Sequence, residues 1–281
     1  MRVTFCGVRG STPAPGHLFA RYGGNTSCVA ITAADAEDPT LVLDAGTGLS
    51  RLSADLGGRP FRGSILLGHL HWDHTHGLPF FPAGDNPEAS GIVYQPEQGD
   101  PIEVLERVMS PPHFPIPPTE LRGSWAFKSM EPGHHEIEGF HVEAREIPHR
   151  GGRTFGFRIS DGRSTIAYMS DHWPLAYGPG PHGEGEFHDE ALALADDVDL
   201  LIHDAQYTRA EFPARAHFGH STIDYAIELG ERAGVAKVVL FHHDPSRTDD
   251  QLDAVVSVNQ HHSVRVIAAV EGMSLDLRKR Q

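Results

Sequence analysis

The sequence predicts an α/β fold (α+β in some schemes) in one domain that spans residues 1–281. Short apolar runs with strand character alternate with stretches of helical period, and this alternation is typical of α/β architecture. No change of composition marks a linker, and a chain of 281 residues is long enough for one large domain. Residues 82–136 are rich in Pro and Gly, and we expect them to form an insert within this domain.

In the first half of the chain, apolar runs predict strands over residues 1–7, 27–32, 40–43 and 64–70. A short helix is expected over 48–56. A second is expected over 101–109, where apolar side chains recur with helical spacing. The prolines of residues 110–118 exclude a helix there. That segment is either a surface connector or a lid.

The second half repeats the alternation of strands and helices. Alternating or continuous apolar runs predict strands over 140–147, 154–159, 164–169, 200–202, 238–241 and 264–270. Helical patterns cover 190–195, 223–233 and 249–258.

Composition and charge exclude several classes of protein. The chain has 39% hydrophobic residues and no run of 18 apolar residues, so we expect no membrane span. Its N-terminus begins directly as a strand without signal-peptide features, which favours the cytoplasm. The two cysteines, Cys6 and Cys28, are expected to be buried thiols.

The net charge of −15 disfavours a long nucleic acid as partner, since a protein that binds a polyanion needs a basic surface. The only basic run is Arg278, Lys279 and Arg280. Two bound dications would make a locally positive site in this acidic body, which fits a small anionic substrate better. A homodimer is compatible with the sequence.

The most informative stretch is Gly68–Gly77 (GHLHWDHTHG), which follows an apolar run. His69 and His71 share one side if the strand continues, and Asp73 and His74 can turn toward a second point nearby. Imidazole and carboxylate ligands without cysteine suit zinc, manganese or iron. The stretch therefore predicts two adjacent metal positions, a known device for attack at phosphorus or carbonyl centres.

This pattern resembles that of the metallo-β-lactamase superfamily, along nearly the whole chain. Phe5–Pro13 (FCGVRGSTP) and Tyr22–Cys28 (YGGNTSC) resemble its phosphodiesterase branch, which includes ribonuclease Z, phosphoribosyl cyclic phosphodiesterases and cyclic nucleotide phosphodiesterases. The resemblance implies a four-layer αββα sandwich of two mixed sheets flanked by helices. It also implies a hydrolase with two divalent ions, zinc first and manganese or iron as alternatives.

The resemblance implies further ligands, each after a strand. His149 would complete the first metal's set with His69 and His71, and Asp171 would bridge the two ions. The second ion would be held by Asp73, His74 and one histidine of the pair 242–243. We choose His242 over His243. Asp44 is expected to orient the histidine loop without binding metal.

The resemblance also implies an acid catalyst. His220, in a His-Ser-Thr sequence, would protonate the leaving oxygen, and Asp204 would support it. The family's usual glutamate is an aspartate here, which puts that pairing in doubt. His220 could instead belong to the N-cap region of the following helix, with Ser221 as the cap.

The expected reaction is hydrolysis of a phosphodiester, with Asp73 and Asp171 holding the attacking water. The opening loop offers Arg9, Ser11, Arg21 and Asn25 as substrate contacts, since an arginine can bind phosphate with two donors. Ribonuclease Z carries a long arm between the positions of His149 and Asp171, where only 21 residues (150–170) lie here. We therefore favour a small cyclic phosphodiester, either a cyclic nucleotide or phosphoribosyl cyclic phosphate. Ribonuclease Z activity and acyl hydrolysis (lactonase or thioesterase) are the alternatives.

Overall fold

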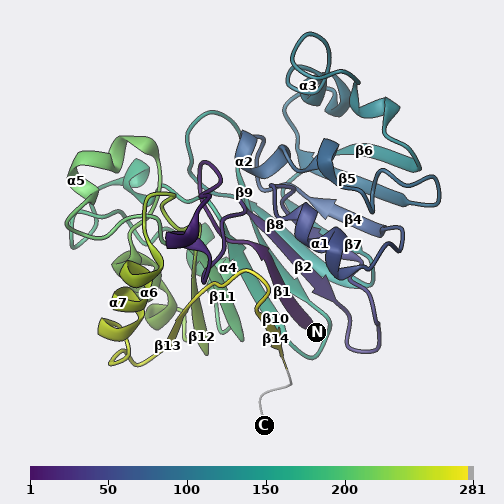
Figure 1. Cartoon of the computed structure of the whole chain (residues 1–281). Helices are drawn as coiled ribbons and strands as arrows, with labels where there is room; N and C mark the ends of the chain where they lie inside the picture. Colours follow the sequence, from purple (N-terminus) through teal and green to yellow (C-terminus); the bar gives the residue numbers. More distant parts are fainter. Residues whose placement is uncertain (278–281) are drawn as a thin grey trace.

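The computed structural model describes residues 1–277, and the basic run Arg278, Lys279 and Arg280 lies outside them. Two seven-stranded sheets pack face to face, and helices cover their outer faces (Figure 1). This is the αββα sandwich that the family resemblance implies.

The first sheet has the order β14-β1-β2-β3-β4-β5-β6. Its pairs are antiparallel from β14 to β3 and parallel from β3 to β6. The strands are β1 (Arg2–Gly7), β2 (Cys28–Thr32), β3 (Leu41–Leu43), β4 (Arg62–Leu66), β5 (Ser90–Pro96), β6 (Ser124–Met130) and β14 (Ser274–Asp276).

The second sheet has the order β13-β12-β11-β10-β9-β8-β7. It is parallel from β13 to β10 and antiparallel from β10 to β7. The strands are β7 (Gly133–Ile137), β8 (Phe140–Glu146), β9 (Phe155–Ser160), β10 (Thr165–Met169), β11 (Leu200–Asp204), β12 (Lys237–Phe241) and β13 (Arg265–Ala268).

The helices begin and end at recognisable signals. Asp100 caps one of them, accepting from the backbone N–H groups of Ile102 and Glu103, and a reciprocal capping box of Thr248 and Gln251 starts another. The α-helices are α1 (Leu49–Asp55), α2 (Trp72–Thr75), α3 (Pro101–Glu106), α4 (Asp189–Ala195), α5 (Phe212–Arg215), α6 (Ile223–Arg232) and α7 (Asp249–Val258). Short 3₁₀ helices are η1 (His17–Phe19), η2 (Leu78–Phe80), η3 (Pro118–Glu120), η4 (Pro174–Tyr177) and η5 (Ala216–Phe218).

The main core lies between the two sheets. Phe5 and Leu66 of the first sheet and Tyr168 and Phe241 of the second belong to one buried cluster. The rings of Phe5 and Phe241 lie 6.1 Å apart. Separate apolar clusters fill the space beneath α1 and beneath α4 and α6, so the central strands of each sheet are buried on both faces.

Several predicted boundaries differ from the structure. The strand predicted over 64–70 ends at Leu66, because the Gly68 N–H donates to the Asp44 carboxylate (2.7 Å) and leaves the strand ladder. Strands β5, β6, β7 and β14 were not predicted. β6 and β7 have largely exposed or half-buried faces, and β14 has three residues, so these three strands carry no clear apolar run. β5 carries only the short run Ile92, Val93 and Tyr94.

One edge of the sandwich collects the loops of interest. In each sheet the strands that precede these loops run in the same direction, so β1, β3, β4, β8, β10, β11 and β12 all end at this edge. Residues 110–118 lie elsewhere: Phe114 packs edge-to-face on Phe80 and lines a separate small cavity beside α3. Within residues 1–277, no helix has the length and apolar character to cross a membrane.

Candidate active site

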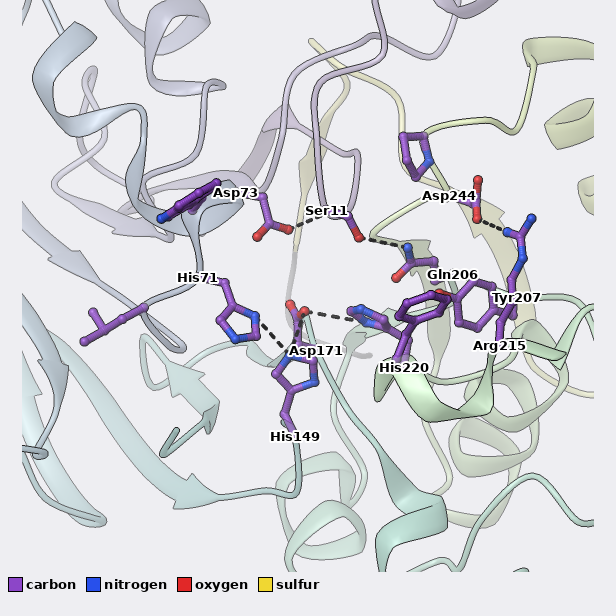
Figure 2. A pocket seen from close by; sticks show the side chains of 14 residues that line it. Ser11, His71, Asp73, His149, Asp171, Gln206, Tyr207, Arg215, His220 and Asp244 are labelled. Atoms are coloured by element: carbon purple, nitrogen blue, oxygen red, sulfur yellow. Dashed lines mark hydrogen bonds and ion pairs between the residues drawn. The ribbon is translucent and has the colours of Figure 1, made fainter. Parts of the chain in front are cut away.

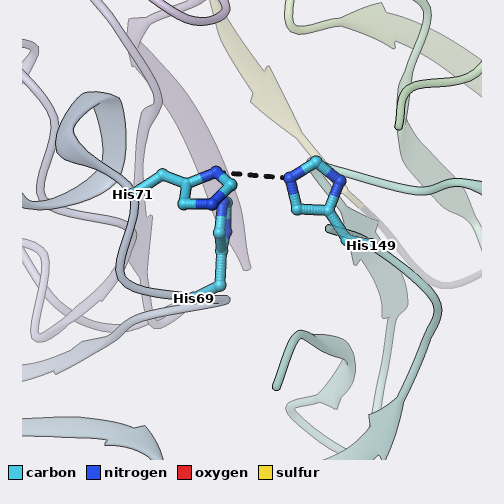
Figure 3. Close-up of side chains that lie close together, drawn as sticks. All are labelled: His69, His71 and His149. Atoms are coloured by element: carbon cyan, nitrogen blue, oxygen red, sulfur yellow. Dashed lines mark hydrogen bonds between the residues drawn. The ribbon is translucent and has the colours of Figure 1, made fainter. Parts of the chain in front are cut away.

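Three imidazoles converge from two loops. His69 and His71 follow β4, and His149 follows β8. The ring centre of His69 lies 4.3 Å from that of His71 and 4.8 Å from that of His149. Nδ1 of His71 and Nε2 of His149 are 3.3 Å apart (Figure 3). The structure thus brings together the set predicted for the first ion.

A second group lies beside the first. Asp73 and His74 lie on α2, Asp171 follows β10, and His242 follows β12. The Asp73 Oδ2 is 3.3 Å from Nε2 of His74 and 3.1 Å from Nε2 of His242. All ligand atoms of this group lie within 4.8 Å of one another. The structure also brings together the set predicted for the second ion.

Asp171 lies between the two groups, and its two oxygens face different partners. Oδ1 is 3.9 Å from Nε2 of His69 and 3.6 Å from Nε2 of His149. Oδ2 is 3.0 Å from Nε2 of His74 and 3.4 Å from Nε2 of His242. A carboxylate divided in this way is placed to contact two cations at once.

Unpartnered buried atoms test whether these residues fit metal ions. Nε2 of His69, Nε2 of His74 and Oδ2 of Asp171 are buried and make no hydrogen bond. His74 Nε2 approaches the Asp171 oxygen closely, but not in hydrogen-bonding geometry. Each unsatisfied buried polar group costs about 1–3 kcal/mol, so a cation among these atoms would relieve the cost. The nitrogen and oxygen donors therefore fit divalent metal.

Burial and charge set the protonation of the two groups differently. Burial lowers the pKa of His149 to about 4 and holds that of His69 well below its usual range. Burial also opposes charge on His74, but the carboxylates of Asp171 and Asp73 outweigh it and raise its pKa. The pKa of Asp171 is held well below its usual range: burial opposes this, and His242 and His74 prevail.

Asp44, after β3, holds the histidine loop from behind. Its Oδ2 accepts hydrogen bonds from Nδ1 of His74 (2.7 Å), the Tyr168 hydroxyl (2.6 Å) and the Ser170 hydroxyl (3.1 Å). Its Oδ1 accepts from the Gly68 N–H. Nε2 of His74 is thereby directed to the site, as expected of a carboxylate that orients a ligand.

The orientation of two other histidines follows from their hydrogen bonds. Nδ1 of His149 donates to the Gly219 carbonyl (2.7 Å), so its Nε2 faces the site. His243 points away, donating from Nε2 to the Ala269 carbonyl (3.0 Å). Of the pair 242–243, His242 is the one that the structure places in the cluster.

His220 and Asp204 form a pair beside the second group. Nδ1 of His220 is 3.0 Å from Asp204 Oδ2, so the shorter carboxylate still reaches it. Asp204 Oδ2 also accepts from the N–H groups of His172 (3.1 Å) and Ser221 (3.2 Å). The N-cap of α6 is neither His220 nor Ser221 but Thr222, whose hydroxyl accepts from the Tyr225 N–H.

A cavity of about 610 Å³ opens above the clusters (Figure 2). Of the four predicted substrate contacts, only Ser11 lines it, and its N–H donates to Asp73 Oδ2 (2.7 Å). The Arg9 guanidinium is buried on backbone carbonyls. Arg21 pairs with acidic residues of α7, and Asn25 donates to Glu271. The structure does not bring these three to the cavity.

The cavity also contains residues that sequence reasoning missed. Trp72 and Phe218 are exposed aromatic side chains, the first next to the predicted ligands His71 and Asp73 and the second near the predicted acid His220. Gln206 and Arg215 come from the segment after β11. The adjacency of Trp72 to His71 and of Phe218 to the His220 loop was the signal available in the sequence. Nothing in the sequence indicated Gln206 or Arg215.

A three-histidine chain behind Asp171 was missed as well. Nδ1 of His172 is 2.9 Å from Nε2 of His203, and Nε2 of His172 is 2.7 Å from Nε2 of His188. Nδ1 of His203 donates to the Asp204 carbonyl, so one set of neutral tautomers satisfies the chain. The chain links His172, the residue after Asp171, to His203 of β11 and to His188 at the N-cap of α4.

The fold and the site together define the class of this protein: an αββα sandwich whose site residues fit divalent metal. Comparison with known proteins gives the family of the chain. The beta-lactamase superfamily domain matches residues 40–243, so the chain belongs to this superfamily of metal-dependent hydrolases. The predicted family and enzyme class are thereby confirmed.

Individual relatives are more distant. The ribonuclease Z of Lacticaseibacillus casei is 24% identical, over 86% of this chain and 84% of its own. The crystal structure of YhfI from Bacillus subtilis, a metallo-beta-lactamase fold protein, has a TM-score of 0.71 at 18% identity and covers 98% of this chain and 99% of its own. A diphosphatase from the PhnP family has a TM-score of 0.71 at 16% identity and covers 99% and 98%. At these identities the two structures establish the fold alone.

Proposed function

We propose that this chain is a dinuclear metal-dependent phosphodiesterase that hydrolyses a small cyclic phosphodiester. The observation that carries the proposal is the division of the Asp171 carboxylate between two groups of imidazoles, with the His220–Asp204 pair beside them. Two metal positions suit the attacking and leaving oxygens of a phosphoryl transfer, and an adjacent imidazole suits protonation of the latter.

The residues would divide the work as follows. One ion would be held by His69, His71 and His149. The other ion would be held by Asp73, His74 and His242. Asp171 would be a ligand of both ions. When bound, two such ions acidify a water molecule and neutralise phosphate charge; zinc is our first candidate, manganese or iron the others. The Ser11 N–H fixes Asp73, and Asp44 fixes His74.

His220 would act as the general acid. Its Nδ1 is held by Asp204, which leaves Nε2 as the nitrogen that can give a proton to the departing oxygen. His220 lines the cavity although it is largely buried, so it can reach a substrate there without being free to rotate. Such proton transfer contributes ~10²–10⁴-fold to rate.

Ribonuclease Z activity is the second candidate, because curated relatives carry that name. Two features favour a smaller substrate. Between His149 and Asp171 the chain contains only β9, β10 and their turns, so no arm extends there. The net charge of −15 also disfavours a long polyanion. The cytoplasm and a homodimer remain predictions.

A substrate panel tests the proposal. Protein loaded with zinc or with manganese is assayed with cyclic mononucleotides, phosphoribosyl cyclic phosphate, pre-tRNA, bis-p-nitrophenyl phosphate and a lactone. We expect turnover of the small phosphodiesters, and loss of both turnover and bound metal in His69→Ala and Asp171→Ala. Cleavage of pre-tRNA alone would favour the second candidate, and lactone hydrolysis without phosphodiester turnover would overturn the proposal.

A further inference from the structure

Gln206, which lines the cavity, has an unsatisfied amide oxygen. Its side-chain Nε2 donates to the Ser11 hydroxyl (3.1 Å), whereas its Oε1 is buried and has no partner. The residue is only 2% exposed, and it lines the cavity. Figure 2 shows the amide between Ser11 and His220. An acceptor buried in this way is stabilised by a ligand that brings an N–H or O–H group.

The position of Gln206 indicates which ligand group that is. Its backbone N–H donates to Asp204 Oδ1 (3.1 Å), and the other oxygen of Asp204 holds His220. The amide therefore lies beside the proposed proton donor, where the leaving oxygen of the substrate would be. In a 3′,5′-cyclic ribonucleotide, the hydroxyl next to the leaving O3′ is the 2′-hydroxyl.

Two aromatic side chains offer a second kind of contact. Trp72, at the start of α2, is 63% exposed, and Phe218, at the end of η5, is 55% exposed. Both line the cavity, close in sequence to His71 and His220. One face of the Trp72 ring stacks on His76, at 5.3 Å and 17° between planes, so the other face is available. Aromatic faces of this kind are the usual partners of a nucleobase.

The charges of the cavity disfavour a ligand with additional phosphates. Among residues 1–277, Arg215 is the one arginine or lysine that lines the cavity. Its guanidinium is paired with Asp244 and lies over the Tyr207 ring, 5.5 Å from its centre. The cavity therefore offers aromatic and hydrogen-bonding contacts. A second phosphate group would instead need cationic side chains that are not already paired.

We propose that these residues form a nucleoside subsite. Gln206 with Ser11 binds the 2′-hydroxyl of a ribose, and Trp72 and Phe218 stack on its base. The inference rests on the proposed function only for the placement of the phosphate at the metal centre. Gln206, Trp72 and Phe218 are thus specificity-determining residues, and they select a cyclic ribonucleotide over the base-free phosphoribosyl alternative.

Binding of hydrolysis products tests the subsite without relying on turnover. Calorimetry on the zinc-loaded protein compares adenosine 5′-monophosphate, its 2′-deoxy analogue and ribose 5-phosphate. We expect the first to bind about tenfold more tightly than each of the others, since one base stack or one satisfied buried acceptor is worth about that factor.

Variants assign each contact. Trp72→Ala and Phe218→Ala should bring the ratio of adenosine monophosphate to ribose 5-phosphate affinity toward one. Gln206→Leu should bring the ratio of the affinity for adenosine monophosphate to that for its 2′-deoxy analogue toward one. Phe80→Ala removes an equally exposed aromatic ring that lines a different cavity, and it should leave both ratios unchanged. Thermal unfolding and metal content verify that each variant is folded and loaded.

The outcomes separate the two proposals. Equal affinity for the three ligands, or no measurable binding of adenosine monophosphate, would overturn the subsite even if bis-p-nitrophenyl phosphate is hydrolysed. Selective binding without hydrolysis of any phosphodiester would leave the subsite and overturn the phosphodiesterase.

Discussion

Nδ1 of His74 donates a 2.7 Å hydrogen bond to Oδ2 of Asp44, and both side chains are fully excluded from solvent. The same oxygen accepts from Tyr168 and Ser170, so three donors converge on one atom. The bond fixes the tautomer of His74 with its free nitrogen toward Asp171. The bond connects the residue that follows β3 to the histidine loop, and Asp44 itself is not a proposed metal ligand.

Asp44→Asn should therefore weaken metal binding without removing any ligand. An amide in place of the carboxylate cannot accept all of these bonds, and loss of such an orienting group typically costs ~10–100-fold in metal affinity. Competition with a chelator measures the affinity. Asp55→Asn, on the exposed face of α1, is the matched control. Unchanged affinity in Asp44→Asn would show that the histidine orients itself.

His220→Ala should reduce turnover by ~10²–10⁴-fold while both metal ions remain bound. The reason is that His220 bonds to Asp204 instead of completing either ligand group in our assignment. Metal analysis after dialysis and steady-state kinetics give the two readouts. A p-nitrophenolate leaving group needs little protonation, so bis-p-nitrophenyl phosphate should be affected less than a cyclic nucleotide. Wild-type rates on both would refute the role of general acid.

His243 should make the metal-free protein less stable in acid. Burial lowers its pKa to about 3, whereas an unfolded histidine titrates near ~6.5. Below that pH the unfolded chain binds a proton that the folded chain does not. The free energy of unfolding then falls by about 1.4 kcal/mol per pH unit until the folded pKa is reached.

Denaturant unfolding of the chelated protein between pH 7 and 4.5 measures this slope. His243→Gln keeps an N–H donor for Ala269 but cannot titrate, so its slope should be smaller by one proton. His134→Gln, at an exposed position, should leave the slope unchanged. Parallel slopes for wild type and His243→Gln would contradict the prediction.

Arg9→Lys should act on stability and not on substrate affinity. The fully buried guanidinium donates to the carbonyls of Gly23 (2.8 Å) and Arg247 (2.7 Å), and more weakly to that of Asp244. A lysine cannot reproduce the planar set of donors of the guanidinium, so we expect the free energy of unfolding to fall by about 3 kcal/mol. Chemical denaturation measures it. A raised KM with unchanged stability would instead return Arg9 to the role of substrate contact.

The sequence was most informative where the relevant residues are local. Four candidate ligands fall within residues 69–74, and their spacing alone predicted two metal positions. His149, Asp171 and His242 came from the family resemblance, which requires ligands after strands, and the choice of His242 over His243 came from it as well. The structure places all seven at one edge of the sandwich.

Tertiary contacts decided what the sequence could not. Arg9 is a plausible phosphate contact by residue type. In the structure its guanidinium is buried and contacts the segment 244–249, so it stabilises the fold instead. Strands β5 and β6 lie in a Pro/Gly-rich segment, and most residues of both are exposed or half-buried, so neither was predicted. Gln206 is significant only because the opening loop supplies Ser11 beside it.

The metal centre unites halves of the chain that are synthesised at different times. Four of the candidate ligands come from the first sheet's loops, and three come from the second sheet's, the last being His242. A growing polypeptide can make β1 to β6 early, and it completes the proposed ligand set of the first ion with Asp171 after β10. The proposed set of the second ion is complete only when His242, after β12, has been made. The complete two-ion site that we propose should therefore form only late in the synthesis of the chain.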